Sequence, residues 1–245
     1  MTYCVGLLLD AGLVFLADSR TSAGVDQVST FRKVTVFQRR KDRVMVLMSS
    51  GNLAISQSVV SLMHEHRETA ATTTIESVPN MFEAARYVGD VLREVHRRDA
   101  AALKDHGVEF NANFILGGQI GSEVPRLFSL YPAGNFIEAT PDTPYMQIGE
   151  SKYGKPIIDR VVTRSTSLAQ AAKCALISMD STMRSNLGVG MPIDILVVRR
   201  DTCEAELSYR IEPGEPYFHD LRERWSAALR AAHAGIPRPP YKNIR

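Results

Sequence analysis

The pattern of apolar and polar positions divides the chain into alternating groups of strands and helices. Short, β-prone apolar runs separated by turn residues fill the N-terminal part and return in the middle and near the end. The predicted strands are 3–9, 13–17, 34–37, 43–48, 110–117, 126–131, 136–139, 145–148, 193–198 and 205–209. Because turns of hairpin length join many of them, we expect mainly antiparallel sheets.

Helical spacing of apolar residues occurs in two pairs of segments between the strand groups and once after the last strand. The predicted helices are 53–67, 79–103, 155–164, one that starts at Ser167, and one within 215–234. Pro79 suits a first helical position, and Ser167 followed by Gln170 forms a capping-box pattern.

This order of elements predicts an α+β protein with a four-layer αββα sandwich, in which helices cover the outer faces of two stacked, mainly antiparallel sheets. We expect the sandwich to span residues 2–211 and a C-terminal helix with an extended tail to span 212–245. Leu221, Trp225 and Leu229 lie on one face of that helix. This apolar stripe must be buried, either on its own subunit or on an adjacent one, and the tryptophan favours a contact with an adjacent subunit.

Composition excludes several classes of protein. The chain has 245 residues, 44% of them hydrophobic and 23% charged, as in ordinary globular proteins. A net charge of +2 makes nucleic acid a poor partner, and no apolar run approaches the roughly 18–20 residues that span a bilayer. The N-terminus lacks a basic signal-peptide region, and Cys4, Cys174 and Cys203 form no metal-binding or disulfide pattern. We expect a cytoplasmic protein with no membrane partner, no metal and no organic cofactor.

Familiar catalytic motifs are absent, namely G-x-S-x-G, the Walker A loop and H-E-x-x-H. The segment 117–121 lies between predicted strands, which favours a turn over a phosphate site. His64 and His66 are two residues apart on a predicted helix and point to different faces, which favours solvated surface over metal ligation.

The N-terminus offers candidate chemistry. Removal of Met1 would expose Thr2, whose hydroxyl and free α-amine belong to one residue. An α-amine with a pKa of about 8 can act as general base to that hydroxyl. Cys4 is a rival nucleophile, but its place within the first predicted strand favours a buried, inert thiol.

Three downstream segments strengthen the case for Thr2. Leu16-Ala17-Asp18-Ser19-Arg20 ends the second predicted strand, Phe31-Arg32-Lys33-Val34 enters the next, and Ser50-Gly51 precedes a helix. With Thr2, this ordered set resembles a proteasome-type β-subunit, an N-terminal nucleophile hydrolase, over residues 2–210. The bacterial ancestral β-subunit group (Anbu) is the most similar branch, because it also begins Met-Thr-Tyr and carries a C-terminal helical extension.

The resemblance implies a role for each matching position. Thr2 would be the nucleophile, Lys33 would lie beside its hydroxyl, and Asp18 would pair with Lys33, since a buried ammonium needs a carboxylate partner. The Gly51 N–H would donate to the oxyanion, and the backbones of Ser22 and Gly51 would pair with an extended peptide. Taken singly, each residue is also consistent with a structural role, such as a turn cap or a solvated strand entry.

Further residues complete the expected site. Arg20 and Ser49 are predicted to line the pocket that binds the substrate side chain. The later loops depart from the family pattern, because Glu150 stands where the family has serine and Asn186 where it has aspartate. Ser151, Ser185 and Asn186 are therefore the residues predicted to supply the oxygens that orient the Thr2 amine.

These implications predict a self-compartmentalising threonine peptidase that acts on peptides or unfolded proteins as a homo-oligomer, in a closed or a helical ring. No motif points to an unfoldase partner. Two alternatives stay open at this stage: a small-molecule amidase of the same nucleophile class, and a weakly active or non-catalytic assembly subunit.

Overall fold

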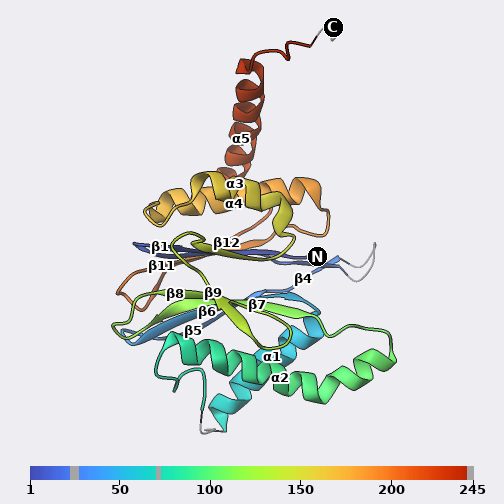
Figure 1. Cartoon of the computed structure of the whole chain (residues 1–245), viewed down its shortest axis with the longest axis vertical. Helices are drawn as coiled ribbons and strands as arrows, with labels where there is room; N and C mark the ends of the chain where they lie inside the picture. Colours follow the sequence, from blue (N-terminus) through green and yellow to red (C-terminus); the bar gives the residue numbers. More distant parts are fainter. Residues whose placement is uncertain (23–27, 70–72, 242–245) are drawn as a thin grey trace.

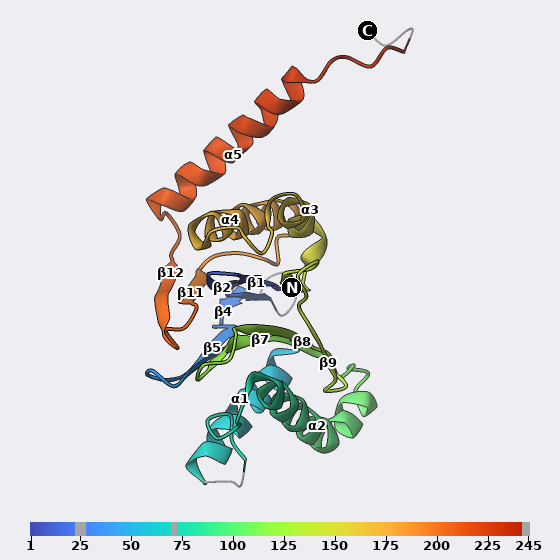
Figure 2. The ribbon, with the colours of Figure 1, turned by 60° about the vertical axis from the view of Figure 1, so that its left-hand side comes forward.

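The computed structural model describes residues 1–22, 28–69 and 73–241. Two five-stranded antiparallel sheets are stacked face to face, and helices cover both outer faces (Figures 1 and 2). The first sheet has the strand order β10-β1-β2-β11-β12, and the second has the order β5-β6-β7-β8-β9. The predicted four-layer αββα sandwich is therefore confirmed.

The strands of the first sheet are β1 (Tyr3–Leu9), β2 (Gly12–Asp18), β10 (Tyr145–Gly149), β11 (Ile193–Arg199) and β12 (Ala205–Ile211). The strands of the second sheet are β5 (Val34–Arg39), β6 (Arg43–Gly51), β7 (Ala112–Ile120), β8 (Arg126–Leu130) and β9 (Phe136–Glu138). The helices are α1 (Leu53–Glu68), α2 (Met81–Asp105), α3 (Ser151–Val161), α4 (Leu168–Ser185) and α5 (Pro216–Gly235).

Apolar side chains fill all three spaces between the four layers. One cluster lies between the two sheets, a second between the second sheet and α1 with α2, and a third between the first sheet and α3 with α4. In β1, Cys4 and Leu8 belong to the cluster between the sheets, whereas Tyr3, Val5 and Leu7 belong to the helix side. Both faces of this strand are buried, which explains its continuous apolar sequence.

Several element boundaries differ from the sequence predictions. The second helix begins at Met81, not at Pro79, because the Asn80 side chain accepts the Glu83 N–H at 2.9 Å and caps α2. The predicted turn at Gly117 and Gly118 is wrong. Strand β7 continues through Ile120, since a side chain at Gly118 would collide with the β6 backbone.

The third helix starts at Ser151 and ends at Val161, earlier than predicted at both ends. The cap at Ser167 is confirmed, because its side chain accepts the Gln170 N–H at 3.4 Å. The stretch before Lys33 carries no strand in the prediction, yet it contains the short pair β3 (Arg20–Ser22) and β4 (Val28–Thr30). The rest of that stretch, residues 23–27, lies outside the described residues.

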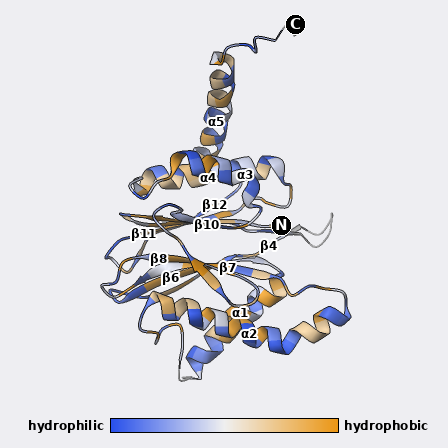
Figure 3. Ribbon diagram, viewed as in Figure 1, coloured by the Kyte–Doolittle hydropathy of each residue, from blue (hydrophilic) through white to orange (hydrophobic). Residues whose placement is uncertain are grey.

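Helix α5 contacts the body of the molecule only near its N-terminal end (Figure 2). Phe218 and Leu221 are buried against the α4 side, and the Arg222 guanidinium donates to the Asp180 carboxylate at 2.6 Å. Leu229, which shares a face with Leu221, is 50% exposed. Apolar residues thus continue along α5 beyond the body (Figure 3). Of the predicted tail, residues 242–245 lie outside the described residues.

Within the described ranges, no helix combines the length and the apolar character that crossing a bilayer requires.

Candidate active site

The end of β10 fixes the position of Thr2, which lies just ahead of β1 and is 8% exposed. The Thr2 carbonyl oxygen accepts the Glu150 N–H at 2.7 Å, and the next residue, Tyr3, pairs with Gly149. Gly149 has a φ of 81°, and a side chain there would collide with the Thr2 carbonyl. Glycine is therefore required at position 149 for this close approach.

A buried ion pair lies beside Thr2. Asp18 ends β2, Lys33 immediately precedes β5, and the Lys33 Nζ donates to Asp18 Oδ1 at 2.7 Å. The Tyr3 N–H donates to the same oxygen at 3.0 Å, and the Gly190 N–H donates to Oδ2 at 3.3 Å. One carboxylate thus connects β1, β2, Lys33 and the loop after α4.

Burial raises the pKa of the Asp18 carboxyl, and the Lys33 ammonium and the backbone donors oppose this shift. The Lys33 Nζ also donates to the Arg20 carbonyl at 2.7 Å and to the Met1 carbonyl at 3.4 Å. The ammonium group therefore lies against the peptide bond that joins Met1 to Thr2.

A cavity of 360 Å³ surrounds Thr2, and we call it the Thr2 cavity. Its lining residues are Met1, Thr2, Ser50, Gly51, Asn111, Asn113, Gly149 and Glu150. Gly51 has a φ of 102°, and a side chain there would collide with the Asn111 carbonyl. The end of β6 can therefore turn into α1 at this point only with glycine.

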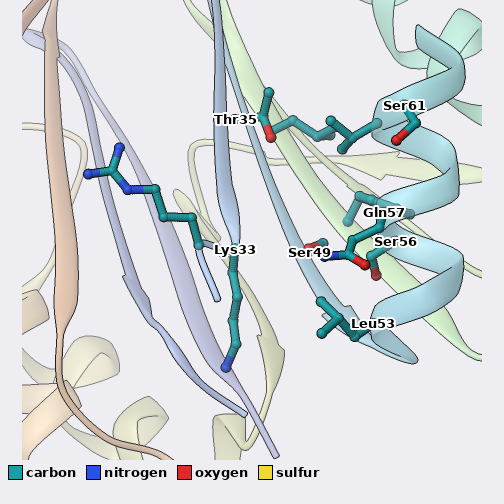
Figure 4. A pocket seen from close by; sticks show the side chains of 11 residues that line it. Lys33, Thr35, Ser49, Leu53, Ser56, Gln57 and Ser61 are labelled. Carbon is teal, nitrogen blue, oxygen red and sulfur yellow. The ribbon is translucent and has the colours of Figure 1, made fainter. Parts of the chain in front are cut away.

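A second cavity of 260 Å³ lies between α1 and the second sheet, and we call it the α1 cavity (Figure 4). Its lining residues are Arg32, Lys33, Thr35, Leu47, Ser49, Leu53, Ser56, Gln57, Val60, Ser61 and Phe114. Consecutive residues of β6 connect the two cavities, because Ser49 lines the α1 cavity whereas Ser50 and Gly51 line the Thr2 cavity.

The structure brings most of the predicted catalytic residues together. Thr2 and Gly51 line one cavity, and Lys33 reaches the Met1 carbonyl from its pair with Asp18. Ser49 lines the adjoining α1 cavity.

Arg20 is not among the residues that line the α1 cavity. Its guanidinium donates to the Leu187 carbonyl at 3.0 Å and packs directly against Gly190. Arg20 therefore holds the loop that donates the Gly190 N–H to Asp18. Ser22 pairs with Val28 in the short β3–β4 ribbon.

Among the predicted amine-orienting residues, none lines the Thr2 cavity. Ser151 is the first residue of α3, and Ser185 is exposed at the end of α4. The Asn186 Oδ1 accepts the Gly188 N–H at 2.8 Å, and Gly188 packs against the Met1 side chain.

Asn111 and Asn113 also line the Thr2 cavity, although the sequence did not predict them as site residues. They reach it through the β6–β7 register, in which Ser50 pairs with Asn113 and Gly51 pairs with Ala112. Glu150 also lines the cavity, at the position where the family pattern has serine.

The rival nucleophile Cys4 lies fully buried between the sheets. Burial strongly raises the pKa of its thiol, which keeps the sulfur protonated and unreactive. Among the described residues, no group of three or more His, Cys, Asp or Glu side chains could hold a metal ion.

The stacked antiparallel sheets between two helical layers, with residue 2 in a cavity beside a buried Lys–Asp pair, define the class of N-terminal nucleophile hydrolases. No family model matches the chain. The Anbu (ancestral β-subunit) structure from Yersinia bercovieri is 51% identical, with a TM-score of 0.92, and the similarity covers 98% of this chain and 100% of the other.

The helical assembly of the Anbu complex from Pseudomonas aeruginosa is 45% identical, with a TM-score of 0.94 and coverage of 99% and 100%. A proteasome subunit beta from Methanopyrus kandleri is 25% identical over 209 residues, which are 84% of this chain and 90% of that protein. The chain therefore belongs to the Anbu family of proteasome-type β-subunits.

Proposed function

We propose that this protein is a threonine peptidase that hydrolyses peptide bonds, with Thr2 as its nucleophile once Met1 has been removed. The observation that carries the proposal is the buried Asp18–Lys33 pair, whose ammonium lies 3.4 Å from the carbonyl of the Met1–Thr2 peptide bond. A cation at this place favours the negative charge that develops on the Thr2 oxygen during attack.

The mechanism follows from these positions. The Thr2 α-amine takes the proton from the Thr2 hydroxyl, and the oxygen attacks the carbonyl carbon of the substrate. The Gly51 N–H donates to the resulting oxyanion, and the protonated amine gives its proton to the leaving amine. Water then releases the acyl group by the same route. Lys33 disfavours a second cation nearby and so keeps the α-amine neutral before attack.

We propose that Asn186 and Ser151 orient the Thr2 amine, because Asn186 belongs to the loop whose Gly190 N–H donates to Asp18, and Ser151 follows Glu150, whose N–H donates to the Thr2 carbonyl. Ser185, which is exposed at the end of α4, has weaker support than these two residues. We further propose that the backbones of Ser22 and Gly51 pair with an extended substrate, and that the substrate side chain enters the α1 cavity beside Ser49.

The test of Thr2 is covalent labelling. A β-lactone or epoxyketone is expected to modify the wild-type protein and not the Thr2→Ala variant, because the variant lacks the attacking oxygen. The matched control is Thr163→Ala, which removes an exposed hydroxyl far from the site in the chain. Intact mass spectrometry reads out both labelling and the loss of Met1. Equal labelling of Thr2→Ala would refute the nucleophile, and retained Met1 would favour a non-catalytic assembly subunit.

We also propose that copies of this chain assemble into a closed or helical ring. Residues 2–211 would form the catalytic sandwich, and residues 212–245 would contact an adjacent copy. Support comes from α5, which leaves the body while Leu229 remains half exposed and Ile236 is 68% exposed (Figure 2). The Anbu complex from Pseudomonas aeruginosa, to which this chain is similar, forms a helical assembly.

Truncation after Ile211 is therefore expected to shift the protein to smaller species in analytical ultracentrifugation. A second truncation, after Gly235, keeps α5 and removes only the tail, so it separates the contribution of α5 from that of residues 236–245. Because removal of Phe218 also uncovers the α4 side, the double variant Trp225→Ala with Leu229→Ala tests the outer face of α5 in an otherwise complete chain. Unchanged sedimentation of that double variant and of the truncation would show that α5 is a local brace.

A further inference from the structure

The residues that line the α1 cavity indicate which kind of substrate side chain fits there, which the catalytic residues do not. Its floor comes from the second sheet, through Thr35, Leu47, Ser49 and Phe114, and its other wall comes from one face of α1. In Figure 4, the Ser56 and Gln57 side chains extend from α1 toward Ser49, whereas the Lys33 side chain points away from them. A side chain placed here would therefore contact hydroxyl and amide groups.

The cavity lining holds no carboxylate. Both charged residues of the lining are cations: the Lys33 Nζ pairs with Asp18, and Arg32 is exposed and also lines a small separate cavity beside Asp194. A lysine or arginine side chain entering the cavity would find no counter-ion, and burial of an unpaired charge is costly.

The other polar side chains of the cavity are neutral. Ser56 donates its hydroxyl to the Asn52 carbonyl at 3.0 Å. By contrast, the hydroxyls of Thr35, Ser49 and Ser61 and the Gln57 amide form no hydrogen bond with another group in the described parts of the chain. These groups alternate with apolar walls from Leu47, Leu53, Val60 and Phe114.

We propose that the α1 cavity selects an uncharged side chain with an aliphatic stem and a hydrogen-bonding end, of which glutamine is the natural example, on the acyl side of the cleaved bond. Gln57 is the specificity-determining residue, because its exposed amide lies at the rim of the cavity on α1. This inference rests on the proposed function, since it assigns the substrate class of the same site.

The experiment compares four fluorogenic peptides that differ only in the residue before the cleaved bond, which is glutamine, leucine, lysine or glutamate. For the wild-type protein, kcat/KM is expected to be highest for glutamine, by about tenfold over leucine and by more over lysine. Gln57→Glu supplies the missing counter-ion and should raise the lysine-to-glutamine ratio of kcat/KM by about tenfold. His64→Glu adds the same charge on α1 outside the cavity and should leave the profile unchanged.

A binding measurement separates this inference from the proposed mechanism. Fluorescence anisotropy with the Thr2→Ala variant measures the affinity for the same four peptide side chains without any turnover. The expected order of affinity, with glutamine first, supports the inference even if wild type cleaves nothing, in which case the proposed function alone fails. Wild-type preference for lysine, leucine or glutamate, or a Gln57→Glu profile equal to wild type, would overturn it.

Discussion

Replacing Lys33 by alanine is expected to abolish peptide hydrolysis, with a loss of about a thousandfold or more, while the fold remains intact. The ammonium lies 3.4 Å from the carbonyl oxygen of the peptide group that contains the Thr2 nitrogen, and its loss removes the charge that stabilises the attacking oxygen. The fold survives because Asp18 keeps the Tyr3 and Gly190 N–H donors and can take up a proton in its buried setting.

The measurements are the rate of β-lactone labelling, the kcat for a fluorogenic peptide, and the circular dichroism spectrum. Lys155→Ala is a suitable control, because that lysine is exposed on α3, where it pairs with Asp159. A Lys33→Ala protein that labels at the wild-type rate would show that the ammonium has no part in the chemistry.

Replacing Asp18 by alanine is expected to destabilise the protein by about 3–5 kcal/mol, in addition to removing activity. Asp18 is fully buried and Lys33 is 6% exposed, so the variant leaves an ammonium in the interior with only carbonyl partners. The Tyr3 and Gly190 N–H groups also lose their acceptor, which loosens the start of β1 and the loop after α4.

Chemical denaturation with urea gives the free energy of unfolding for this comparison. Asp142→Ala removes an exposed carboxylate and should change stability by less than about 0.5 kcal/mol. If Asp18→Ala unfolds at the wild-type urea concentration, the Asp18–Lys33 pair is not a structural element of the native state.

The sequence predicted the layers well because each strand group and helix pair has a strong local pattern. β1 is apolar throughout, α4 begins with a capping serine, and each predicts its element without knowledge of its neighbours. The predicted boundaries were wrong where tertiary contacts determine the end of a strand or helix. Gly118 suggests a turn in isolation, yet the β6 backbone passes so close to it that only glycine can continue the strand there.

The same contrast between local sequence patterns and tertiary contacts applies to the candidate active site. The Asp18–Lys33 pair joins two short motifs, and the resemblance to a known family placed both of them together. The contacts of Arg20 carry no local signal, because its guanidinium reaches a loop far along the chain, at Leu187 and Gly190. Asn111 carries no local signal, since it reaches the Thr2 cavity only through the pairing of β6 with β7.

The hydrogen bond from the Glu150 N–H to the Thr2 carbonyl has a consequence for maturation. The structure holds Thr2 from its carbonyl side, through Glu150, Gly149 and the Tyr3 N–H bonded to Asp18, and none of these contacts involves the Thr2 nitrogen. Cleavage of the Met1–Thr2 bond would therefore leave every one of these anchors in place. Conversion of the newly made chain to the active form would create a basic amine at a position already set, without any rearrangement of the backbone.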